Sequence, residues 1–434
     1  MAAESRAQRR IQSLYRHLSP QASDASSLLQ PTVLRAERLS LRDGREAVVI
    51  GGMVLDIHAL PFSPPAPGTT TPGKVHYVLG GVARNIADCM SKLGGKPFFI
   101  SAVGLDMAGN HLLEHWRSTG HPIEGILQTQ DITTAVVCCV LDPNGEVAAG
   151  VASFESIEKF LTAEWIQQFR YEISSAPVVM VDANLNNRAL EASCRLATGD
   201  NIPLWFEPVS VAKSKKIASI VKYVTYVSPN EDELFAMADA LSPGKLYGLS
   251  ERYRSEKNCP AESHINMLKP AIVLLLEKGI KIVVVTIGAR GVFLCSKEGS
   301  ILTRAVVEKP QRLGISSELH KLISSDCPSQ KFHDAKHIEG TSRLFALHLP
   351  GLPASVKKLT GAGDCLVGAT LASICEGLNI IQAISVGIAA AKATVEADSN
   401  VPLTFDLVGV AGMNILSIKT AGNSCILGYP INLV

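Results

Sequence analysis

Six nearly continuous apolar runs recur along the chain from residue 47 onward. They read AVVIGGMVLDI, KPFFISAVG, APVVMVDANL, PLWFEPVSV, VTYVSPN and KIVVVTIGARG. Strands that are buried on both faces have this pattern, because neither face of such a strand meets water. The sequence therefore predicts strands in the interior of a sheet that is covered on both sides.

Segments with helical periodicity lie between these runs. They read RNIADCMSKLG, DMAGNHLLEHWRSTG, NRALEASCRLA, EDELFAMADAL and HINMLKPAIVLLLEKG. Strands that alternate with helices indicate a parallel sheet with helices on both faces. The predicted fold class is therefore α/β, and ligands of such a sheet bind at the carboxyl ends of its strands.

Two segments, residues 73–81 and 133–153, interrupt this alternation. VHYVLGG and TTAVVCCVLDPNGEVAAGVAS have the pattern of antiparallel strands, and the second contains a hairpin turn at Pro143, Asn144 and Gly145. We expect a small sheet that projects from the main layer as a lid.

Other segments lack a regular pattern. Residues 308–355 are polar, with scattered Pro, Ser and His, and predict an irregular insertion. Residues 1–44 form a basic leader that we expect to be flexible, and its first 36 residues carry five Arg against one Asp and one Glu. This composition is typical of a mitochondrial transit segment, but a disordered leader or a tether has the same composition.

Composition and charge restrict the class of partner. The chain has 434 residues, enough for a large core, and its 41 basic and 40 acidic residues leave a net charge of +1. Such a balance favours neither nucleic acid nor an anionic membrane surface, and no apolar run reaches the roughly 18 residues of a membrane span. The ten cysteines contain no CxxC pair, which is typical of reduced thiols in an intracellular protein. We expect a small-molecule partner and a cytoplasmic location, with the mitochondrion as the alternative.

The stretch LTGAGDCLVGATLASICEGL joins a loop of small residues to an apolar helix. Gly361, Ala362 and Gly363 leave their backbone N–H groups unshielded at the start of this helix, which suits an anion such as phosphate. Asp364 follows directly, although a carboxylate repels phosphate. A general base that takes the proton of a hydroxyl attacking a phosphoryl group has reason to lie there. A helix cap is the alternative role for Asp364.

Two further motifs end strands or open helices with polar groups. GGMVLD ends the first apolar run at Asp56, and GGVARN places Gly80 and Gly81 before a helix that contains Asn85. A carboxylate and an amide in such positions can hydrogen-bond the vicinal hydroxyls of a sugar. Each residue alone could also be a turn residue.

Motifs in the second half of the chain suit a nucleotide. SPNEDE spaces Asn230 and Glu233 by one helical turn, which could orient hydrated Mg²⁺ near phosphates or could form a capping box. VTIGARGV places Thr286, Gly288 and Gly291 at the end of a strand, where a nucleotide could lie against the backbone. A plain β-turn explains the second motif as well.

Taken in this order, the motifs resemble those of the PfkB (ribokinase-like) family of carbohydrate and nucleoside kinases. GGVARNIADCMSKLG resembles its first signature, VGLDMAGN with Asp106 its helix-opening segment, NEDE its Asn-x-x-Glu element and TGAGDCLVG its second signature. The resemblance covers about residues 45–402. It implies a three-layer α/β fold with a mostly parallel central sheet, a small β-sheet lid, and transfer of phosphate from ATP to an alcohol.

Within the family, GGVARNIA, VDANL and WFEPVSVAKS are most similar to the pseudouridine kinases. This resemblance implies phosphorylation of the pseudouridine 5′-hydroxyl by ATP with Mg²⁺, a step that precedes cleavage by a pseudouridine-5′-phosphate glycosidase. The alternatives are a kinase for ribose, adenosine or another nucleoside, and a catalytically weak binding protein with this fold.

The resemblance also implies a role for each motif. It implies sugar binding by Asp56, Gly80, Gly81 and Asn85. It implies organisation of Mg²⁺ and phosphates by Asn230 and Glu233, with Glu233 acting on the metal indirectly. It implies an ATP site lined by Thr286, Gly288 and Gly291. It implies an anion hole formed by Gly361, Ala362 and Gly363, with Asp364 as the base.

Three features depart from the family pattern. Lys358 and Leu359 replace an Asp-Thr pair whose Asp helps to bind an activating K⁺, so K⁺ dependence is in doubt. Lys358 could supply the missing positive charge, or it could point into water. The long insertion is the second departure, and the atypical tail of residues 403–434 is the third. Family members often dimerise through the lid, and TTAVVCCVL suits such an interface or a core equally.

Overall fold

The computed structural model describes residues 46–64, 68–142, 147–153, 155–244, 260–304, 343–406, 409, 412 and 427–430. These residues belong to one compact unit that starts at Glu46. The predicted leader (1–44), the hairpin turn at Pro143–Gly145 and most of the predicted insertion lie outside the described residues. Within those residues, no helix has the length and apolar character needed to cross a bilayer.

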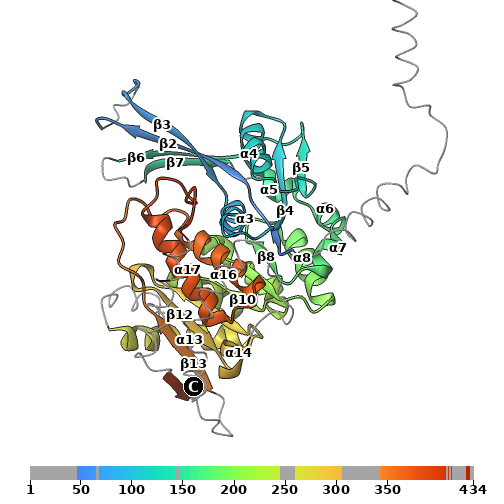
Figure 1. The fold of residues 1–434 in the computed structure, drawn as a ribbon, viewed down its shortest axis with the longest axis vertical. Coiled ribbons are helices and arrows are strands. Elements are labelled where there is room, and N and C mark those ends of the chain that lie inside the picture. Colours follow the sequence, from blue (N-terminus) through green and yellow to red (C-terminus); the bar gives the residue numbers. More distant parts are fainter. Residues whose placement is uncertain are drawn as a thin grey trace, which may run out of the picture. The chain divides into compact units, whose positions relative to one another are not determined.

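Within the described residues, the strands make up two sheets (Figure 1). The main sheet has ten strands, which are β1 (Val48–Ile50), β4 (Phe98–Gly104), β5 (Ile126–Thr129), β8 (Val179–Asp182), β9 (Leu204–Glu207), β10 (Tyr226–Val227), β11 (Ile282–Thr286), β12 (Val292–Ser296), β13 (Arg343–Leu349) and β14 (Leu427–Pro430). The second sheet has four strands, which are β2 (Val54–Pro61), β3 (Gly73–Gly80), β6 (Ala135–Leu141) and β7 (Val147–Ser153).

Helices connect the strands. In chain order they are α3 (Val82–Lys92), α4 (Met107–Ser118), α5 (Glu155–Phe160), α6 (Ala163–Gln167), α7 (Arg170–Ser175), α8 (Asn187–Gly199), α9 (Val211–Ser214), α10 (Ile217–Ile220), α11 (Glu231–Leu241), α13 (Ala261–Glu277), α14 (Gly299–Thr303), α16 (Ala362–Cys375) and α17 (Ile380–Val395). The described residues also contain two short 3₁₀ helices, η1 (Val221–Tyr223) and η2 (Gly288–Arg290).

The main sheet is mostly parallel, as the sequence predicts. Its order is β14-β13-β12-β11-β10-β9-β8-β1-β4-β5, and every neighbouring pair from β11 through to β5 is parallel. The strands β12, β13 and β14 continue the sheet with antiparallel pairs. The carboxyl ends of β1, β8, β9, β10 and β11 therefore lie along one edge of the sheet.

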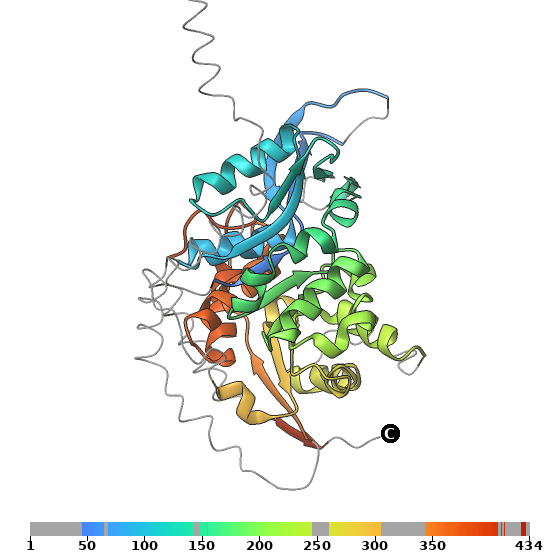
Figure 2. The same cartoon turned by 90° about the vertical axis from the view of Figure 1, so that its right-hand side faces the viewer.

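Alternate residues of the strands face two separate cores. Val49 of β1 packs with apolar residues of α3, α4, α16 and α17, whereas Val48 and Ile50 pack with those of α8, α11 and α13. Figure 2 shows α16 and α17, drawn in red, across the sheet from the green helices. This three-layer arrangement confirms the predicted fold class and explains why the strand sequences are apolar on both faces.

The first predicted strand is in fact two strands in different sheets. Its run AVVIGGMVLDI ends β1 at Ile50 and starts β2 at Val54, and the chain bends between them. A Cβ atom at Gly51 would lie 2.3 Å from Cγ of Asp182, so only glycine fits at this bend. The apolar pattern does not show the bend, because both strands are apolar near it.

The predicted lid forms the second sheet. Its order is β3-β2-β6-β7, with antiparallel pairs β2–β3 and β6–β7 and a parallel pair β2–β6. Figure 1 shows these strands extending past the main sheet. Because β2 follows directly from β1, the end of the lid that carries Asp56 lies next to the carboxyl edge of the main sheet.

The predicted irregular insertion, residues 308–355, contains a strand. Within it β13 pairs with β12, and Leu344 and Leu347 are buried on opposite faces of the sheet. The polar composition around RLFALHL concealed this apolar run, so the prediction was wrong at residues 343–349. In the atypical tail, β14 adds a further strand to the same edge. The sequence also gave no sign of β5 and β12.

Candidate active site

A tight approach between two loops sets the start of α16. Gly361 precedes the helix with a φ of 88°, and a Cβ atom there would lie 2.1 Å from the carbonyl oxygen of Asn400. Only glycine combines that left-handed backbone with so close a neighbour. Ala362 and Gly363 open the helix, and a Cβ atom at Gly363 would meet open space. The first turn therefore presents backbone N–H groups without bulky side chains, as an anion hole requires.

Asp364 lies in the first turn of α16 and contacts α3. Nδ2 of Asn85 donates a hydrogen bond of 2.6 Å to Oδ2 of Asp364. Burial raises the pKa of Asp364 to about 7, against the lowering effects of this hydrogen bond and of the Arg84 guanidinium, while Asp182 and Asp56 raise it further. A carboxylate that titrates near neutral pH is matched to general base catalysis.

The four residues expected at the sugar meet at the junction of the lid and α3. Gly80 ends β3, and Gly81 caps α3, one turn before Asn85. A Cβ atom at Gly80 would lie 2.2 Å from Oδ2 of Asp56, so the absence of a side chain lets β2 and β3 approach at this point. The structure therefore brings together the Asp and the Asn that the sequence assigned to one ligand.

Asp56 is held by a residue that the sequence did not single out. Nδ2 of Asn400 donates to Oδ2 of Asp56 at 3.1 Å, and Nζ of Lys358 donates to Oδ1 of Asn400 at 2.8 Å. Burial raises the pKa of Asp56, and the same cause lowers the pKa of Lys358. The alternative in which Lys358 points into water is wrong, because its Nζ donates to Asn400. Asn400 therefore connects Lys358 to Asp56.

Asn230 and Glu233 form the capping box that the sequence left open as an alternative. Oδ1 of Asn230 accepts from the N–H of Glu233, and Oε2 of Glu233 accepts from the N–H of Asn230, both at 2.9 Å. Burial raises the pKa of Glu233. The pair lies after β10, where Asn230 forms a bridge to Thr286 at the end of β11. The capping box explains why Asn230 and Glu233 are three residues apart. Their position after β10 places them at the carboxyl edge of the sheet.

Thr286, Gly288 and Gly291 belong to the tight turn between β11 and β12. The N–H of Ile287 donates to the Gly291 carbonyl at 2.9 Å, and the N–H of Gly291 donates to the Gly288 carbonyl at 3.1 Å. The motif VTIGARGV therefore forms a tight turn, which was the alternative explanation of its sequence. It lies beside Asn230, so both motifs expected at the nucleotide occupy neighbouring strand ends.

Glu207 is a partly buried acid at the end of β9 that sequence reasoning missed. The hydroxyl of Ser228 donates to its Oε2. Burial raises its pKa well above the usual value, and Glu233, Asp364 and Asp182 raise it further by repulsion. Glu207 therefore lies within electrostatic reach of both Asp364 and the capping box. Its position as the last residue of an apolar run was the available signal.

The acidic groups at this edge suit Mg²⁺ held through water and phosphate. In the part of the chain that the structure describes, no three His, Cys, Asp or Glu side chains are grouped as metal ligands. Mg²⁺ is usually bound by one or two carboxylates together with waters and substrate phosphates, so it needs no such group. Glu233 fits this role, because only its Oε2 is used in the capping box.

Comparison with known proteins agrees with this geometry. The sequence profile of the pfkB family of carbohydrate kinases matches residues 45–311, and the chain belongs to that family. A pseudouridine kinase of Arabidopsis thaliana is 51% identical over 368 residues, which cover 85% of this chain and 95% of that protein. A pseudouridine kinase of Escherichia coli is 29% identical over 208 residues, covering 48% of this chain and 64% of that protein.

Solved structures show the same fold. A ribokinase of Arabidopsis thaliana, solved with ribose and ATP, matches with a TM-score of 0.60 and 16% identity over 86% of this chain and 99% of its own. A ribokinase of Thermotoga maritima matches with a TM-score of 0.60 and 19% identity over 85% of this chain and 99% of its own. These matches show the ribokinase-like fold.

Proposed function

We propose that this protein transfers the γ-phosphoryl group of ATP to the 5′-hydroxyl of pseudouridine. The observation that carries the proposal is the Asp364 carboxylate, whose pKa is about 7 and which lies in the first turn of α16 while bound by Asn85. The named activity of the Arabidopsis relative, at 51% identity over most of both chains, supports the choice of nucleoside.

In this reaction Asp364 acts as the general base. Its carboxylate accepts the proton of the 5′-hydroxyl as the new O–P bond forms, and the bond to the bridging oxygen of ADP breaks. Asn85 holds Oδ2 of Asp364, which leaves Oδ1 for the hydroxyl. The N–H groups at the start of α16 stabilise the charge on the transferred group. Asp56 accepts hydrogen bonds from the ribose hydroxyls.

Two ions belong to the proposal. Mg²⁺, when bound with the nucleotide, neutralises phosphate charge, and Glu233 would hold it through water. We further propose that K⁺ has little effect on turnover. Support comes from Lys358, which stands in place of the carboxylate that binds K⁺ in many relatives and which is engaged with Asn400.

A substrate panel tests the proposal. ATP consumption is measured with pseudouridine, uridine, adenosine and ribose, using Asp364→Asn as the matched inactive control. We expect the highest kcat/KM for pseudouridine. A preference for ribose or adenosine would replace pseudouridine in the assignment. Thermal stabilisation by pseudouridine and ATP without turnover by the wild type would instead establish a binding protein.

We also propose that two copies associate through the outer face of the lid. Tyr77, Ile57, Cys138 and Val151 form one cross-strand row, and the neighbouring Asp56 points to the opposite face. Tyr77 is 57% exposed and Val151 is 77% exposed. Cys138 belongs to the run TTAVVCCVL, which suits an interface or a core equally, and it is exposed in this row. Apolar rows of this kind favour an interface between proteins.

The chemistry of the product indicates which enzyme acts after this one. Pseudouridine 5′-phosphate keeps its C–C glycosidic bond, so a pseudouridine-5′-phosphate glycosidase must act on it next. We propose that the two enzymes are linked in function in the cytoplasm. Fluorescent fusions with and without residues 1–44 test the compartment, and import of the longer fusion into mitochondria would overturn the cytoplasmic assignment.

A further inference from the structure

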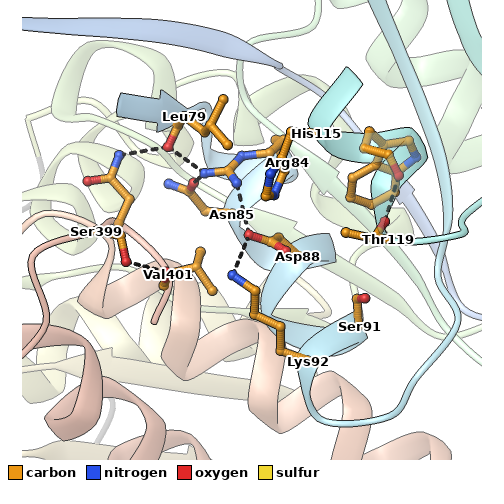
Figure 3. Close-up of polar contacts among 12 residues, drawn as sticks. Leu79, Arg84, Asn85, Asp88, Ser91, Lys92, His115, Thr119, Ser399 and Val401 are labelled. Carbon is orange, nitrogen blue, oxygen red and sulfur yellow. Dashed lines mark hydrogen bonds and ion pairs between the residues drawn. The ribbon is translucent and has the colours of Figure 1, made fainter. Parts of the chain in front are cut away.

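Arg84 is a buried cation in the first turn of α3, and its side chain binds four acceptors. Nη1 donates to Oδ2 of Asp88 at 2.9 Å, and Nε donates to the Gly80 carbonyl at 3.3 Å. Nη2 donates to the Leu79 carbonyl and to Oδ1 of Asn85. Figure 3 shows the guanidinium among these groups. Only 2% of the residue is exposed, so every one of these contacts lies away from bulk water.

The contact with Asn85 selects one of two orientations of its amide. Because Arg84 donates to the oxygen of this amide, the NH₂ group must point the other way, where it donates to Asp364. In the reversed orientation the amide oxygen would face the carboxylate, and two acceptors would meet. Arg84 thus determines which atom of Asn85 the base contacts.

Asp88 keeps this arrangement electrically balanced. It lies one turn after Arg84 and accepts from Arg84 and from Lys92, at 2.9 and 3.1 Å. Its other oxygen has no hydrogen-bond partner among the described residues. A buried guanidinium requires such a counter-charge, since desolvation of an unpaired charge is costly. Lys92 contacts the same carboxylate but none of the groups at the site.

The backbone contacts join the base to the ribose side of the site. The carbonyl of Leu79, near the end of β3, accepts from Arg84 and also from Nδ2 of Asn400 at 3.1 Å. Asn400 in turn donates to Asp56. One carbonyl of a lid strand therefore connects the residue that orients Asn85 with the residue that holds Asp56.

We propose that Arg84 is a positioning residue for phosphoryl transfer, acting through Asn85 on Asp364 and anchored by Asp88. The inference rests on the proposed function only in that Asp364 is the base. Arg84 makes no contact with substrate in this scheme. A planar fork of five N–H donors can bind an amide oxygen, a carboxylate and two carbonyls at once, whereas the single ammonium of lysine cannot.

The positive charge of Arg84 also acts on Asp364, because it lowers the pKa of this carboxyl group. The groups that act on the Asp364 carboxylate are Asn85 and Arg84 of α3, which lower its pKa, and Asp182 of β8 and Asp56 of β2, which raise it. Glu207 of β9 also faces it. Arg84 is the cation among these groups. Its removal is therefore expected to raise the pKa of Asp364 and to move the acid limb of the kcat profile to higher pH.

The experiment compares Arg84→Met, Arg84→Lys and Asp88→Asn with Lys92→Met as the control. We expect kcat of Arg84→Met to fall by about 10- to 100-fold, as removal of a supporting partner commonly does. The KM for ATP should change less than about 2-fold. Lys92→Met should keep the wild-type kcat and pH profile. Arg84→Lys keeps the positive charge, so it should recover the melting temperature and the acid limb of the pH profile, but not kcat, because one ammonium cannot bind Asn85 and both carbonyls at once.

A double-mutant cycle with Asn85→Ala separates positioning from a general effect on folding. If Arg84 acts through Asn85, adding Arg84→Met to Asn85→Ala should lower kcat by less than about 3-fold more. Fully additive losses would overturn the inference, as would recovery of both stability and kcat by Arg84→Lys. If Arg84→Met fails to fold, Asp88→Asn and Arg84→Lys are tested in its place, each alone and together with Asn85→Ala.

The same assay distinguishes failure of this inference from failure of the proposed function. All variants are compared with the wild type on whichever panel substrate it phosphorylates fastest. A wild type that is active on ribose instead of pseudouridine overturns the nucleoside assignment and leaves the Arg84 comparison intact. A folded Arg84→Met with wild-type kcat and an unshifted acid limb overturns the Arg84 inference alone.

Discussion

The side-chain amide of Asn85 donates a 2.6 Å hydrogen bond to the Asp364 carboxylate, although 279 positions separate the two residues in the sequence. Asn85 lies in the segment that resembles the first signature of the family, and Asp364 lies in the segment that resembles the second. Helices α3 and α16 pack together through buried apolar residues such as Ile86 and Val367, and this packing determines that the two polar groups meet. The contact brings together the two segments that are expected at the sugar and at the phosphate.

Asp364→Asn tests the base directly. The amide keeps the size of the side chain and loses its basicity, so kcat should fall by at least ~10²-fold, the lower range for loss of a positioned base. Calorimetric titration should show nearly unchanged affinity for pseudouridine and for ATP. A mutant that turns over near the wild-type rate would show that Asp364 only caps α16.

The raised pKa of Asp364 predicts the acid limb of activity. The base must be ionised, so kcat should rise with pH through an apparent pKa of about 7. The measurement is kcat between pH 5.5 and 9 at saturating substrates. A profile that is flat from pH 5.5 to 8 would contradict an ionisation of Asp364 in this range.

The same pKa predicts a stability effect of opposite sign to the effect on activity. Because the pKa of the folded state is raised, the contribution of Asp364 to stability is complete below its unfolded value and is lost as pH rises through about 7. Asp364→Asn removes the buried charge, so its melting temperature at pH 8.5 should exceed that of the wild type by at least about 2 °C. At pH 5 the difference should be smaller. An equal difference at both pH values would contradict the assigned pKa.

Asp56→Ala should mainly weaken nucleoside binding. Asp56 lies on lid strand β2 and has no replacement there as an acceptor for ribose hydroxyls, so the KM for pseudouridine should rise at least about 10-fold, since a hydrogen bond to a charged group contributes roughly 1.5–3 kcal/mol. The KM for ATP should change little. Equal losses for both substrates would indicate a structural role for Asp56 at the start of the lid.

Lys358 offers a test that separates an ion effect from a packing effect. Replacing Na⁺ by K⁺ at constant ionic strength should change wild-type turnover by less than about 2-fold, if the ammonium already supplies the local positive charge. Lys358→Met should raise the KM for pseudouridine, because Asn400 loses the donor that orients it toward Asp56. Strong activation of the wild type by K⁺ would sink the idea of a built-in cation.

The outer face of the lid predicts a dimer. Val151→Lys should convert a dimer to a monomer in light scattering after size-exclusion chromatography, because it places a charge in the apolar row. Leu403→Lys is the matched control, since Leu403 is 81% exposed and lies outside the lid. A wild type that is monomeric at high concentration would contradict this interface.

The sequence by itself determined the fold class, the strands β4, β8, β9, β10 and β11, the lid strands β3, β6 and β7 and most of the long helices. Apolar runs and helical periodicity are local properties, so they can be read without knowing what packs against them. The motifs at the strand ends likewise identified the carboxyl edge of the sheet as the site, because parallel strands all end there.

Contacts between distant segments were decided only by the tertiary structure. The bend at Gly51 depends on Asp182, the placement of Lys358 depends on Asn400, and the orientation of Asn85 depends on Arg84. The strand β13 lies in a polar segment of the sequence, and only its pairing with β12 shows that it is a strand. The pKa of Asp364 is also a tertiary property, since it results from burial and from charges on α3, β2 and β8, none of which lies near Asp364 in the sequence.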